Sequence, residues 1–332
     1  MIILGIESSC DETAVAIIKN REILAHKIFS QIDIHKIYGG VVPEIASRAH
    51  AEKIDPLIEE ALKEAKMELE DLDVICAGQG PGLIGGVAVG FTYGKALAFA
   101  LDKPFVAVDH LEAHALISRM ENEIPFPHLV FLASGGHTQF IIINGIGDYK
   151  VIGTTLDDAL GEAFDKTAKL LELPYPNGAE VDKLSKIGND IIKLPRPLKG
   201  SKTLNFSFSG LKSAVRRIVK EGDADYKKED ICASFQVAVG DVVADRVDLA
   251  LKTVGKINGL VFAGGVARNQ ALRKKIKNVC EENGIKFFVP DPALCVDNGV
   301  MIAWAGYERA KLGKFNSLDS APYPRKSLED VK

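Results

Sequence analysis

The clearest pattern along the chain is an apolar run, a short polar turn and a second apolar run, and it occurs twice. The first copy covers residues 2–18, with the polar turn 7–13 (ESSCDET) between its apolar runs. The second covers residues 129–143, with the turn 133–138 (ASGGHT). Apolar, β-prone runs joined by a polar turn predict two β-hairpins. Such an internal duplication predicts two similar domains.

Helical and strand patterns alternate along the rest of the chain. Apolar residues recur at helical spacing over 51–66, which predicts an amphipathic helix. Short apolar runs predict buried strands, and helices are expected between them. The expected strands are 74–77, 105–108 and 260–263, and the expected helices run from the Gly-rich turn 78–86 to about 101, from the N-cap Asp109 to 120, over 267–283 and over 298–312. This alternation predicts an α/β protein with mixed sheets.

Composition places the chain among ordinary globular proteins. It has 332 residues, 47% hydrophobic and 26% charged, which suggests roughly two domains of about 150 residues. No apolar run approaches the ~20 residues that span a bilayer. The start lacks the basic region of a signal peptide. The five cysteines are odd in number and form no CxxC pair, which indicates reduced thiols. A cytoplasmic protein is expected.

The net charge of −4 argues against a surface that binds nucleic acid everywhere. Basic residues nevertheless cluster in three places. Most such clusters are solvated helix faces, but on an RNA-binding protein they would contact phosphates without reading sequence. The clusters are Arg196, Lys199 and Lys202 in the loop expected at 194–204; Arg216, Arg217 and Lys220; and Arg268, Arg273, Lys274, Lys275 and Lys277.

Three turns rich in small and hydroxyl residues each follow a β-prone run. They are 7–13, 133–138 and 263–269. Small residues let backbone N–H groups approach an anion, and hydroxyls add donors. Each turn alone is explained by ordinary tight-turn geometry. Their recurrence at corresponding places favours a phosphate-binding role.

His110 and His114 lie four residues apart at the start of an expected helix, about 40° apart around its axis. They can therefore hold one metal ion together. Asp297 could complete the site, or it could be an ordinary N-cap of the helix that follows it. Two surface histidines sharing a face is the alternative for the pair.

A further set of polar residues has two interpretations. Glu162, Asp165 and Lys166 lie on neighbouring faces of one expected helix, and Asp182 follows Gly178 by four residues. They form either a salt-bridged surface or a polar grip on a sugar or substrate.

Two other functions have partial support from motifs. Residues 80–85 match GxGxxG between an expected strand and helix, with Asp109 ending the next strand, as in a dinucleotide-binding site. This motif leaves both hairpins unexplained. A metalloprotease of the HExxH type is disfavoured because Glu112 lies about 200° around the helix from His110.

Nine segments together make the chain resemble the tRNA threonylcarbamoyladenosine transferase (TsaD) family of bacteria and organelles, formerly described as O-sialoglycoprotein endopeptidases. They are GIESSCDETAVAI, YGGVVPEIASRAH, GPGLIGG, VDHLEAH, SGGHTQ, GEAFDKTAKLL, FSFSGLKSA, AGGVARN and VDNGVMIAWAG. The resemblance implies an actin/Hsp70/sugar-kinase-like fold, with two ribonuclease-H-like domains and a nucleotide and metal cleft between them. The expected domains are 1–125, against which the C-terminal segment 298–332 packs back, and 126–297, with a helical insertion at about 155–235.

The resemblance also implies the site residues. It assigns His110, His114 and Asp297 to one Fe²⁺ per chain, with zinc as the other metal. Glu12 is a candidate catalytic group, but no side chain stands out as the general base. Valine is common where Ala133 stands, and Asn177-Gly178-Ala179 replaces a frequent Gly-Gly-Pro. The substrate contacts implied are Leu132, Ala133, Ser134, Gly135, Gly136, Asp165, Gly178, Asp182 and Asn269.

The implied reaction is transfer of a threonylcarbamoyl group from threonylcarbamoyl-AMP to a tRNA. The acceptor is the N6 amine of the adenosine 3′ of the anticodon in tRNAs that read codons starting with A. The expected partners are tRNA, the donor, and either a homodimer partner or the accessory proteins of the bacterial complex, a TsaB-like paralogue and a TsaE-like ATPase, without a membrane. An ATP-hydrolysing regulatory subunit of a tRNA-modification complex and a metalloprotease remain the alternatives.

Overall fold

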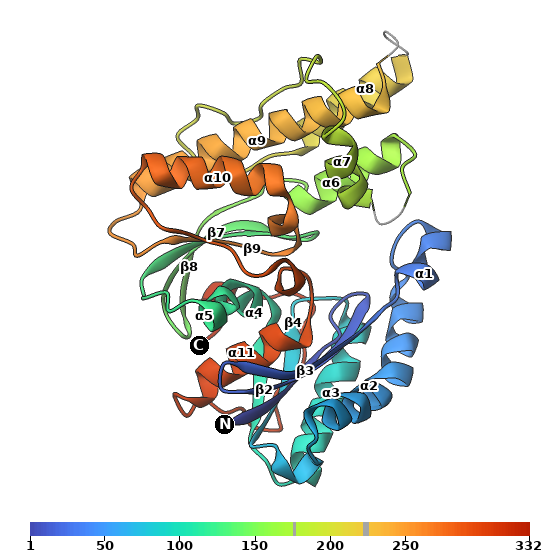
Figure 1. Ribbon diagram of the computed structural model, residues 1–332, viewed down its shortest axis with the longest axis vertical. Coiled ribbons are helices and arrows are strands. Elements are labelled where there is room, and N and C mark those ends of the chain that lie inside the picture. The colour runs from blue at the N-terminus through green and yellow to red at the C-terminus, as the bar shows by residue number, and fades with distance from the viewer. Residues whose placement is uncertain (175–176, 222–225) are drawn as a thin grey trace. The chain divides into compact units, whose positions relative to one another are not determined.

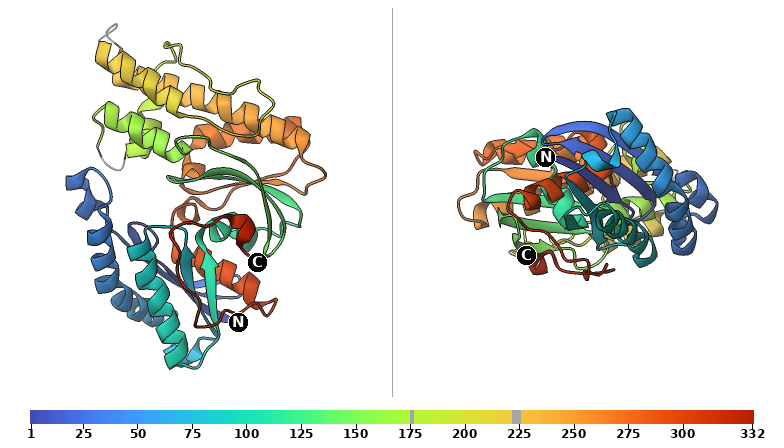
Figure 2. Two further views of the ribbon diagram at one scale, coloured as in Figure 1. Left: turned by 180° about the vertical axis from the view of Figure 1, so that it is seen from behind. Right: turned by 90° about the horizontal axis from the view of Figure 1, so that it is seen from below.

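The computed structural model describes residues 1–174, 177–221 and 226–332. The chain forms two compact units. The first consists of Met1–Glu123, Ile146–Asp148 and Val296–Lys332, and the second of Ile124–Gly145 and Tyr149–Cys295. These borders lie two residues before the expected ones at 125 and 297. Both chain termini belong to the first unit (Figures 1 and 2).

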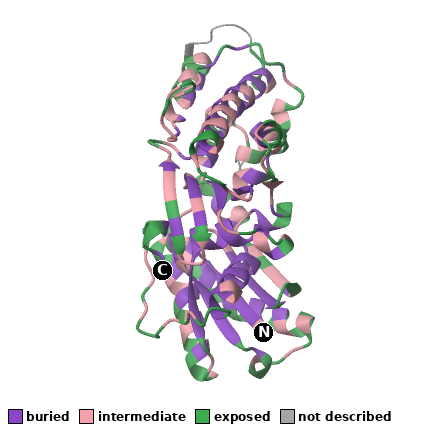
Figure 3. Cartoon of the chain, turned by 90° about the vertical axis from the view of Figure 1, so that its left-hand side faces the viewer, coloured by how far each residue is buried: buried purple, intermediate pink, exposed green. Residues whose placement is uncertain are grey.

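The first unit is built on a five-stranded mixed sheet in the order β3-β2-β1-β4-β5. Strands β1, β2 and β3 are antiparallel, whereas β4 and β5 run parallel to β1. Both β1 and β2 are buried along nearly their whole length (Figure 3), because helices cover both faces of the sheet. The strands are β1 (Ile2–Glu7), β2 (Glu12–Lys19), β3 (Glu22–Ser30), β4 (Val74–Gly80) and β5 (Phe105–Asp109).

Alternate residues of β1 face different helices. Leu4 and Ile6 pack in an apolar core with residues of α2 and α3, which lie side by side (Figures 1 and 2). Gly5 faces α11, and a Cβ there would meet the backbone of Gly299 and Ala303. The helices of this unit are α1 (Ile32–His35), α2 (Pro43–Ala65), α3 (Ile84–Ala100), α4 (His110–Leu116), α5 (Ser118–Glu121) and α11 (Gly299–Ala310).

The second unit repeats the plan of the first. Its sheet has the order β10-β9-β6-β7-β8, with β6 antiparallel to β7 and parallel to β9. Strands β6 to β10 therefore take the places of β1 to β5. This repetition confirms the two similar domains expected from the duplicated hairpin. The strands are β6 (His128–Ala133), β7 (Thr138–Gly145), β8 (Asp148–Thr154), β9 (Leu260–Ala263) and β10 (Phe287–Phe288).

The helices of the second unit pack around a phenylalanine cluster. Phe131 stacks with Phe206 and Phe262 at ring-centroid distances of 5.3 and 5.1 Å. All three rings are fully buried, so they fix the sheet against the segment that leads into α8. The helices are α6 (Leu160–Leu170), α7 (Asn177–Ser185), α8 (Ser209–Glu221), α9 (Lys228–Thr253) and α10 (Gln270–Glu282).

Several expected boundaries differ from the structure. Helix α2 begins at Pro43, eight residues before the expected start, because proline is well suited to the first helical turn. Strand β4 continues to Gly80, so only residues 81–83 connect it to α3. The helix expected from 110 to 120 divides into α4 and α5. Short 3₁₀ helices span Lys36–Tyr38, Leu69–Asp71, Gly265–Arg268, Pro292–Leu294 and Leu328–Asp330.

Among the described residues, no helix has both the length and the apolar character that crossing a membrane would require.

Candidate metal centre and substrate-binding turns

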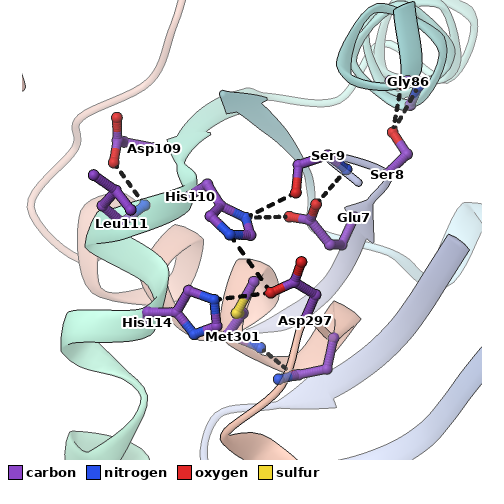
Figure 4. A network of polar contacts seen from close by, with 12 residues as sticks. Glu7, Ser8, Ser9, Gly86, Asp109, His110, Leu111, His114, Asp297 and Met301 are labelled. Atoms are coloured by element: carbon purple, nitrogen blue, oxygen red, sulfur yellow. Dashed lines mark hydrogen bonds and ion pairs between the residues drawn. The ribbon is translucent and has the colours of Figure 1, made fainter. Parts of the chain in front are cut away.

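The two candidate histidine ligands are held by the first turns of α4. The side chain of Asp109 caps this helix, accepting hydrogen bonds from the Leu111 and Glu112 amides at 2.8 and 3.0 Å. The expected N-cap is thereby confirmed. His110 and His114 are both buried, and their ring centroids lie 4.7 Å apart (Figure 4).

Asp297 joins the two histidines from the segment before α11. Its Oδ1 lies 3.0 Å from Nε2 of His114 and 3.5 Å from Nε2 of His110. The N-cap of α11 is Asn298, whose side chain accepts from the Met301 amide at 2.8 Å (Figure 4). The alternative interpretation of Asp297 as the helix cap is therefore wrong, because its neighbour has that role.

The spacing of these atoms fits a metal ion. One ligand atom from each of the three residues lies within 4.8 Å of the others. Two ligands each about 2.1 Å from one ion, at angles near 90–110°, are roughly 3.0–3.4 Å apart. The separations of Asp297 from the two imidazoles are close to this range. Two imidazoles and one carboxylate are also a common donor set for iron and zinc.

The charge around the cluster favours a cation as well. Burial, followed by the negative charges of Asp297 and Asp11, raises the pKa of Glu12 to about 9. Burial would lower the pKa of His110, but Asp297 and Glu7 outweigh it and raise this pKa to about 9. Carboxylates packed this closely repel one another, and a bound cation would relieve the repulsion.

Glu7, at the end of β1, is the residue that sequence reasoning missed. It is fully buried, and its Oε2 lies 3.2 Å from Nδ1 of His110, while its Oε1 accepts from the Ser9 amide at 2.6 Å (Figure 4). Because β1 and β5 are parallel through β4, their carboxyl ends meet at one edge of the sheet. The sequence signal that could have identified Glu7 as a site residue is its place as an acid at the end of an otherwise apolar strand.

The first polar turn is not an open anion cradle. Ser8 Oγ donates to the Gly86 carbonyl and accepts from the Gly90 amide, and Ser9 Oγ lies 3.1 Å from Nδ1 of His110. The hydroxyls expected to bind phosphate are thus engaged within the chain. The structure therefore gives no support to phosphate binding by these two hydroxyls, and a role of the backbone of this turn stays a prediction.

The two rival sites also fail on geometry. A Cβ at Gly82 would lie 2.6 Å from the Ser9 carbonyl, and one at Gly86 would lie 2.6 Å from the Ser8 carbonyl, so the chain itself fills the space beside the GxGxxG turn. Glu112 is fully buried and accepts from Nε of Arg309 at 2.7 Å. Glu112 is thus bound in an ion pair, which removes it as the base of a protease.

The second turn, in the other unit, is open. Leu132 and Ala133 are buried at the end of β6, whereas Gly135 and Gly136 are exposed, and a Cβ at either would meet nothing within 4 Å. Ser134 Oγ accepts from the Gly136 and His137 amides at 3.3 and 3.1 Å, which holds the turn in shape. A ligand can therefore approach the backbone of this turn closely.

Helix α6 links the open turn to three other expected substrate contacts. The Gly161 amide donates to the Ser134 carbonyl at 3.1 Å, and Asp165 lies one helical turn further along the same face. Oδ1 of Asp165 accepts from the Gly178 amide at 2.8 Å. Asp182 follows one turn later in α7, where its Oδ2 pairs with Lys186 at 2.9 Å.

Asn269 and Lys166 have structural partners in the same unit. Asn269 caps α10 by accepting from the Leu272 amide, and its amide exchanges two hydrogen bonds with Gln236. Lys166 pairs with Glu162 at 2.8 Å and with Asp158 at 2.6 Å. The salt-bridged interpretation of the Glu162–Lys166 pair is therefore confirmed.

Comparison with known proteins identifies extended similarity. Residues 22–304 match the family model TsaD, tRNA N6-adenosine threonylcarbamoyltransferase. Proteins of that name from Brucella anthropi, Brucella suis and Brucella ovis are each 52% identical to this chain over 344 residues. Each alignment covers 99% of this chain and 96% of the relative.

More distant solved structures share the fold alone. The (R)-2-hydroxyglutaryl-CoA dehydratase component A of Acidaminococcus fermentans has a TM-score of 0.56 and 19% identity, covering 94% of this chain and 99% of its own. T. kodakarensis HypF has a TM-score of 0.61 and 16% identity, covering 94% of this chain and 47% of its own. With the repeated sheet order, these similarities confirm the expected actin/Hsp70/sugar-kinase-like fold class.

Proposed function

The chain belongs to the tRNA N6-adenosine threonylcarbamoyltransferase family, and from this premise we propose how its residues carry out the transfer. It is a transferase that acts on tRNA. The donor we assign is threonylcarbamoyl-AMP. The acceptor is the N6 amine of the adenosine 3′ of the anticodon in tRNAs that read codons starting with A. The observation that carries this proposal is the full-length family match in a chain whose His110, His114 and Asp297 lie together.

The proposed reaction is an acyl transfer. The adenosine N6 forms a bond to the carbamoyl carbon, and the bond from that carbon to the phosphate oxygen of AMP breaks. The amine loses one proton and AMP leaves with the bonding electrons. Glu12, whose pKa is raised to about 9 by burial and by Asp297 and Asp11, is the candidate for holding a proton at its carboxyl oxygen near this reaction.

The metal centre is assigned to His110, His114 and Asp297, with Fe²⁺ as the expected ion and Zn²⁺ as the other candidate. When bound, the ion would supply a Lewis acid for an oxygen of the donor. The three residues leave coordination positions free for that purpose, because they occupy only three. The burial of both imidazoles limits the access of bulk water.

The adenylate part of the donor is assigned to the second unit. The open backbone of Gly135 and Gly136 suits a phosphate oxygen or the ribose, since no side chain covers it. Leu132, Ala133 and Ser134 set the direction of this turn. The remaining contacts are assigned to Asp165, Gly178, Asp182 and Asn269.

The partners and compartment belong to the same proposal. We assign a TsaB-like paralogue and a TsaE-like ATPase as accessory proteins, or a second copy of the chain in their place. The five cysteines are all free thiols, as in a reducing compartment, which favours the cytoplasm.

Mass spectrometry of tRNA nucleosides tests the function. The chain is incubated with unmodified tRNA, threonine, bicarbonate, ATP, a threonylcarbamoyl-AMP synthase and accessory proteins. Threonylcarbamoyladenosine is expected with the wild-type chain and with His26→Ala, a change in β3 outside the metal cluster. His110→Ala,His114→Ala should lose both the bound metal and the product. Undiminished product from the double variant would instead favour a regulatory ATPase.

A further inference from the structure

Residues 193–220 form a segment with eight cations and no acid. At the average of the chain, 45 acids in 332 residues, a segment of this length would carry about four. The chain therefore contains one strongly basic region although its net charge is −4. Its cations are Lys193, Arg196, Lys199, Lys202, Lys212, Arg216, Arg217 and Lys220.

The C-terminal half of this segment is helix α8, which packs against α6 and α9 (Figure 1). Its inward face carries Leu211 and Val215, both fully buried. Lys212, Arg216 and Lys220 recur every four residues and so share one stripe of the helix. Like charges at this spacing destabilise a helix by about 0.2–0.5 kcal/mol per pair. The stripe therefore does not stabilise the helix that carries it.

The cations of this segment are largely unpaired. Arg196 pairs with Asp241 at 3.1 Å. For the other seven, no ion pair is found within residues 1–174, 177–220 and 226–332. Three of these cations are exposed to solvent, namely Arg216, Arg217 and Lys220. A group of cations that lack ion pairs among the described residues suits an anionic partner.

The third basic cluster of the sequence differs in this respect. Lys275 of α10 pairs with Asp241, and Lys277 lies 3.7 Å from Glu281. The Arg273 guanidinium donates to the carbonyls of Ala267 and Pro290. Most cations of α10 are therefore engaged within the chain, whereas those of α8 make no ion pair with the part of the chain that the structure describes.

A hollow of about 510 Å³ lies between the two halves of the basic segment. Lys193 and Arg217 stand in its lining, with Leu194, Pro195 and Ala214 supplying apolar surface. Two cations beside an apolar floor suit a nucleic-acid backbone, in which charged phosphates alternate with less polar sugars.

We propose that residues 193–220 form the surface that contacts the phosphate backbone of tRNA, with the hollow between Lys193 and Arg217 as one phosphate seat. This inference rests on the proposed function only for the identity of the RNA. The contacts position the tRNA and carry no sequence information.

The test compares two double variants with equal loss of charge. Lys193→Gln,Arg217→Gln removes two cations of the hollow, and Lys274→Gln,Lys277→Gln removes two exposed cations of α10. The affinity of each full chain for tRNA, with accessory proteins present, is measured at several salt concentrations. The log–log slope should fall by about 0.9 for the first variant, because Lys193 and Arg217 share one phosphate seat and each phosphate contact contributes about 0.9. The second should keep the wild-type slope.

Separate readouts distinguish this inference from the proposed function. Metal content and the affinity for the adenylate donor should be unchanged in both variants, while the KM for tRNA rises only in the first. Equal slopes for the two variants and the wild type would overturn the inference, even if the chain is a transferase. Loss of accessory-protein binding with unchanged tRNA affinity would overturn it too, since the surface would then bind protein. Failure of the wild type to modify tRNA would count against the proposed function, while the salt slopes would still decide the surface.

Discussion

Two histidines of the same helix differ in what holds their rings. Nδ1 of His110 lies 3.2 Å from the buried carboxylate of Glu7, which fixes the proton on Nδ1 and turns Nε2 toward Asp297. Nδ1 of His114 is buried and has no hydrogen-bond partner among the described residues. The ring of His110 is thus held from both nitrogens, whereas that of His114 is held through Nε2 alone, which lies 3.0 Å from Oδ1 of Asp297. A carboxylate behind a histidine ligand also raises its basicity.

We predict that Glu7→Gln weakens metal binding by about 10- to 100-fold, the usual effect of removing such a partner. The amide keeps the shape of the side chain, so the fold should persist. Competition with a chelator measures the affinity, and circular dichroism checks the fold. Ser9→Ala, which keeps the carboxylate, should have a smaller effect. Equal metal affinity in wild type and Glu7→Gln would contradict this role of Glu7.

Neighbouring glycines in the second unit have different reasons for being glycine. Gly264 has a φ of +88°, and a Cβ there would clash with the Ala133 carbonyl. Gly135 has no such restraint, since a Cβ would meet nothing within 4 Å. Glycine is therefore required by the fold at position 264, whereas the open space at Gly135 can accommodate a ligand.

Substitutions at these two positions should therefore separate stability from binding. We predict that Gly264→Ala lowers the free energy of unfolding by roughly 1–3 kcal/mol through overpacking, with added strain from the positive φ. Gly135→Val should change stability little and abolish adenylate binding in calorimetry. Gly255→Val, at another open glycine of this unit, should change neither. Full adenylate affinity in a folded Gly135→Val chain would remove the turn from the binding site.

Helix α8 depends on a carboxylate from a distant part of the chain. Oδ1 of Asp157 accepts from the Phe208 and Ser209 amides at 2.8 and 3.1 Å, and Oδ2 accepts from the Ser207 and Ser209 hydroxyls. Partial burial opposes ionisation, but these hydrogen bonds outweigh it and hold the pKa of Asp157 below its usual range. Asp157 thereby anchors the first residues of the helix that carries the basic stripe.

Asp157→Asn should lower the free energy of unfolding by about 0.5–2 kcal/mol at pH 7, the usual cost of losing a helix cap. Because the folded pKa is depressed, the contribution of Asp157 is present above the unfolded value near 3.9 and is lost as the pH falls through the folded value. Denaturant unfolding between pH 7 and 3 should show a smaller acid loss in the variant. Asp190→Asn, at an exposed position, is the control. Parallel pH curves for wild type and Asp157→Asn would show that the charge does not matter.

The whole chain carries more acid than base, 45 residues against 41. Long-range attraction to RNA is therefore absent, and contact depends on local patches. We predict that the isolated chain binds tRNA with a dissociation constant of about 1 µM or weaker at physiological salt, in the range of nonspecific binding. Fluorescence anisotropy with and without accessory proteins measures this. Tight, salt-insensitive binding by the chain alone would contradict the argument.

The sequence by itself determined the elements and the pairing of the histidines. Both hairpins, the strands β5 and β9, and the cap at Asp109 depend on residues close together in the chain, so local patterns predict them. The spacing of His110 and His114 is likewise a property of one helix. The local pattern did not define helix ends, since α2 begins at Pro43 and not at residue 51.

The tertiary structure decided which polar residues can bind a metal ion and which are engaged in helix caps or ion pairs. Glu7 reaches His110 across 103 residues, and Arg309 neutralises Glu112 across 197. Asn298 takes the helix cap and leaves Asp297 beside the histidines. Partners so far apart leave no periodic signal in the sequence. Whether a carboxylate binds a metal, caps a helix or neutralises an arginine depends on which distant group the fold brings within about 3 Å.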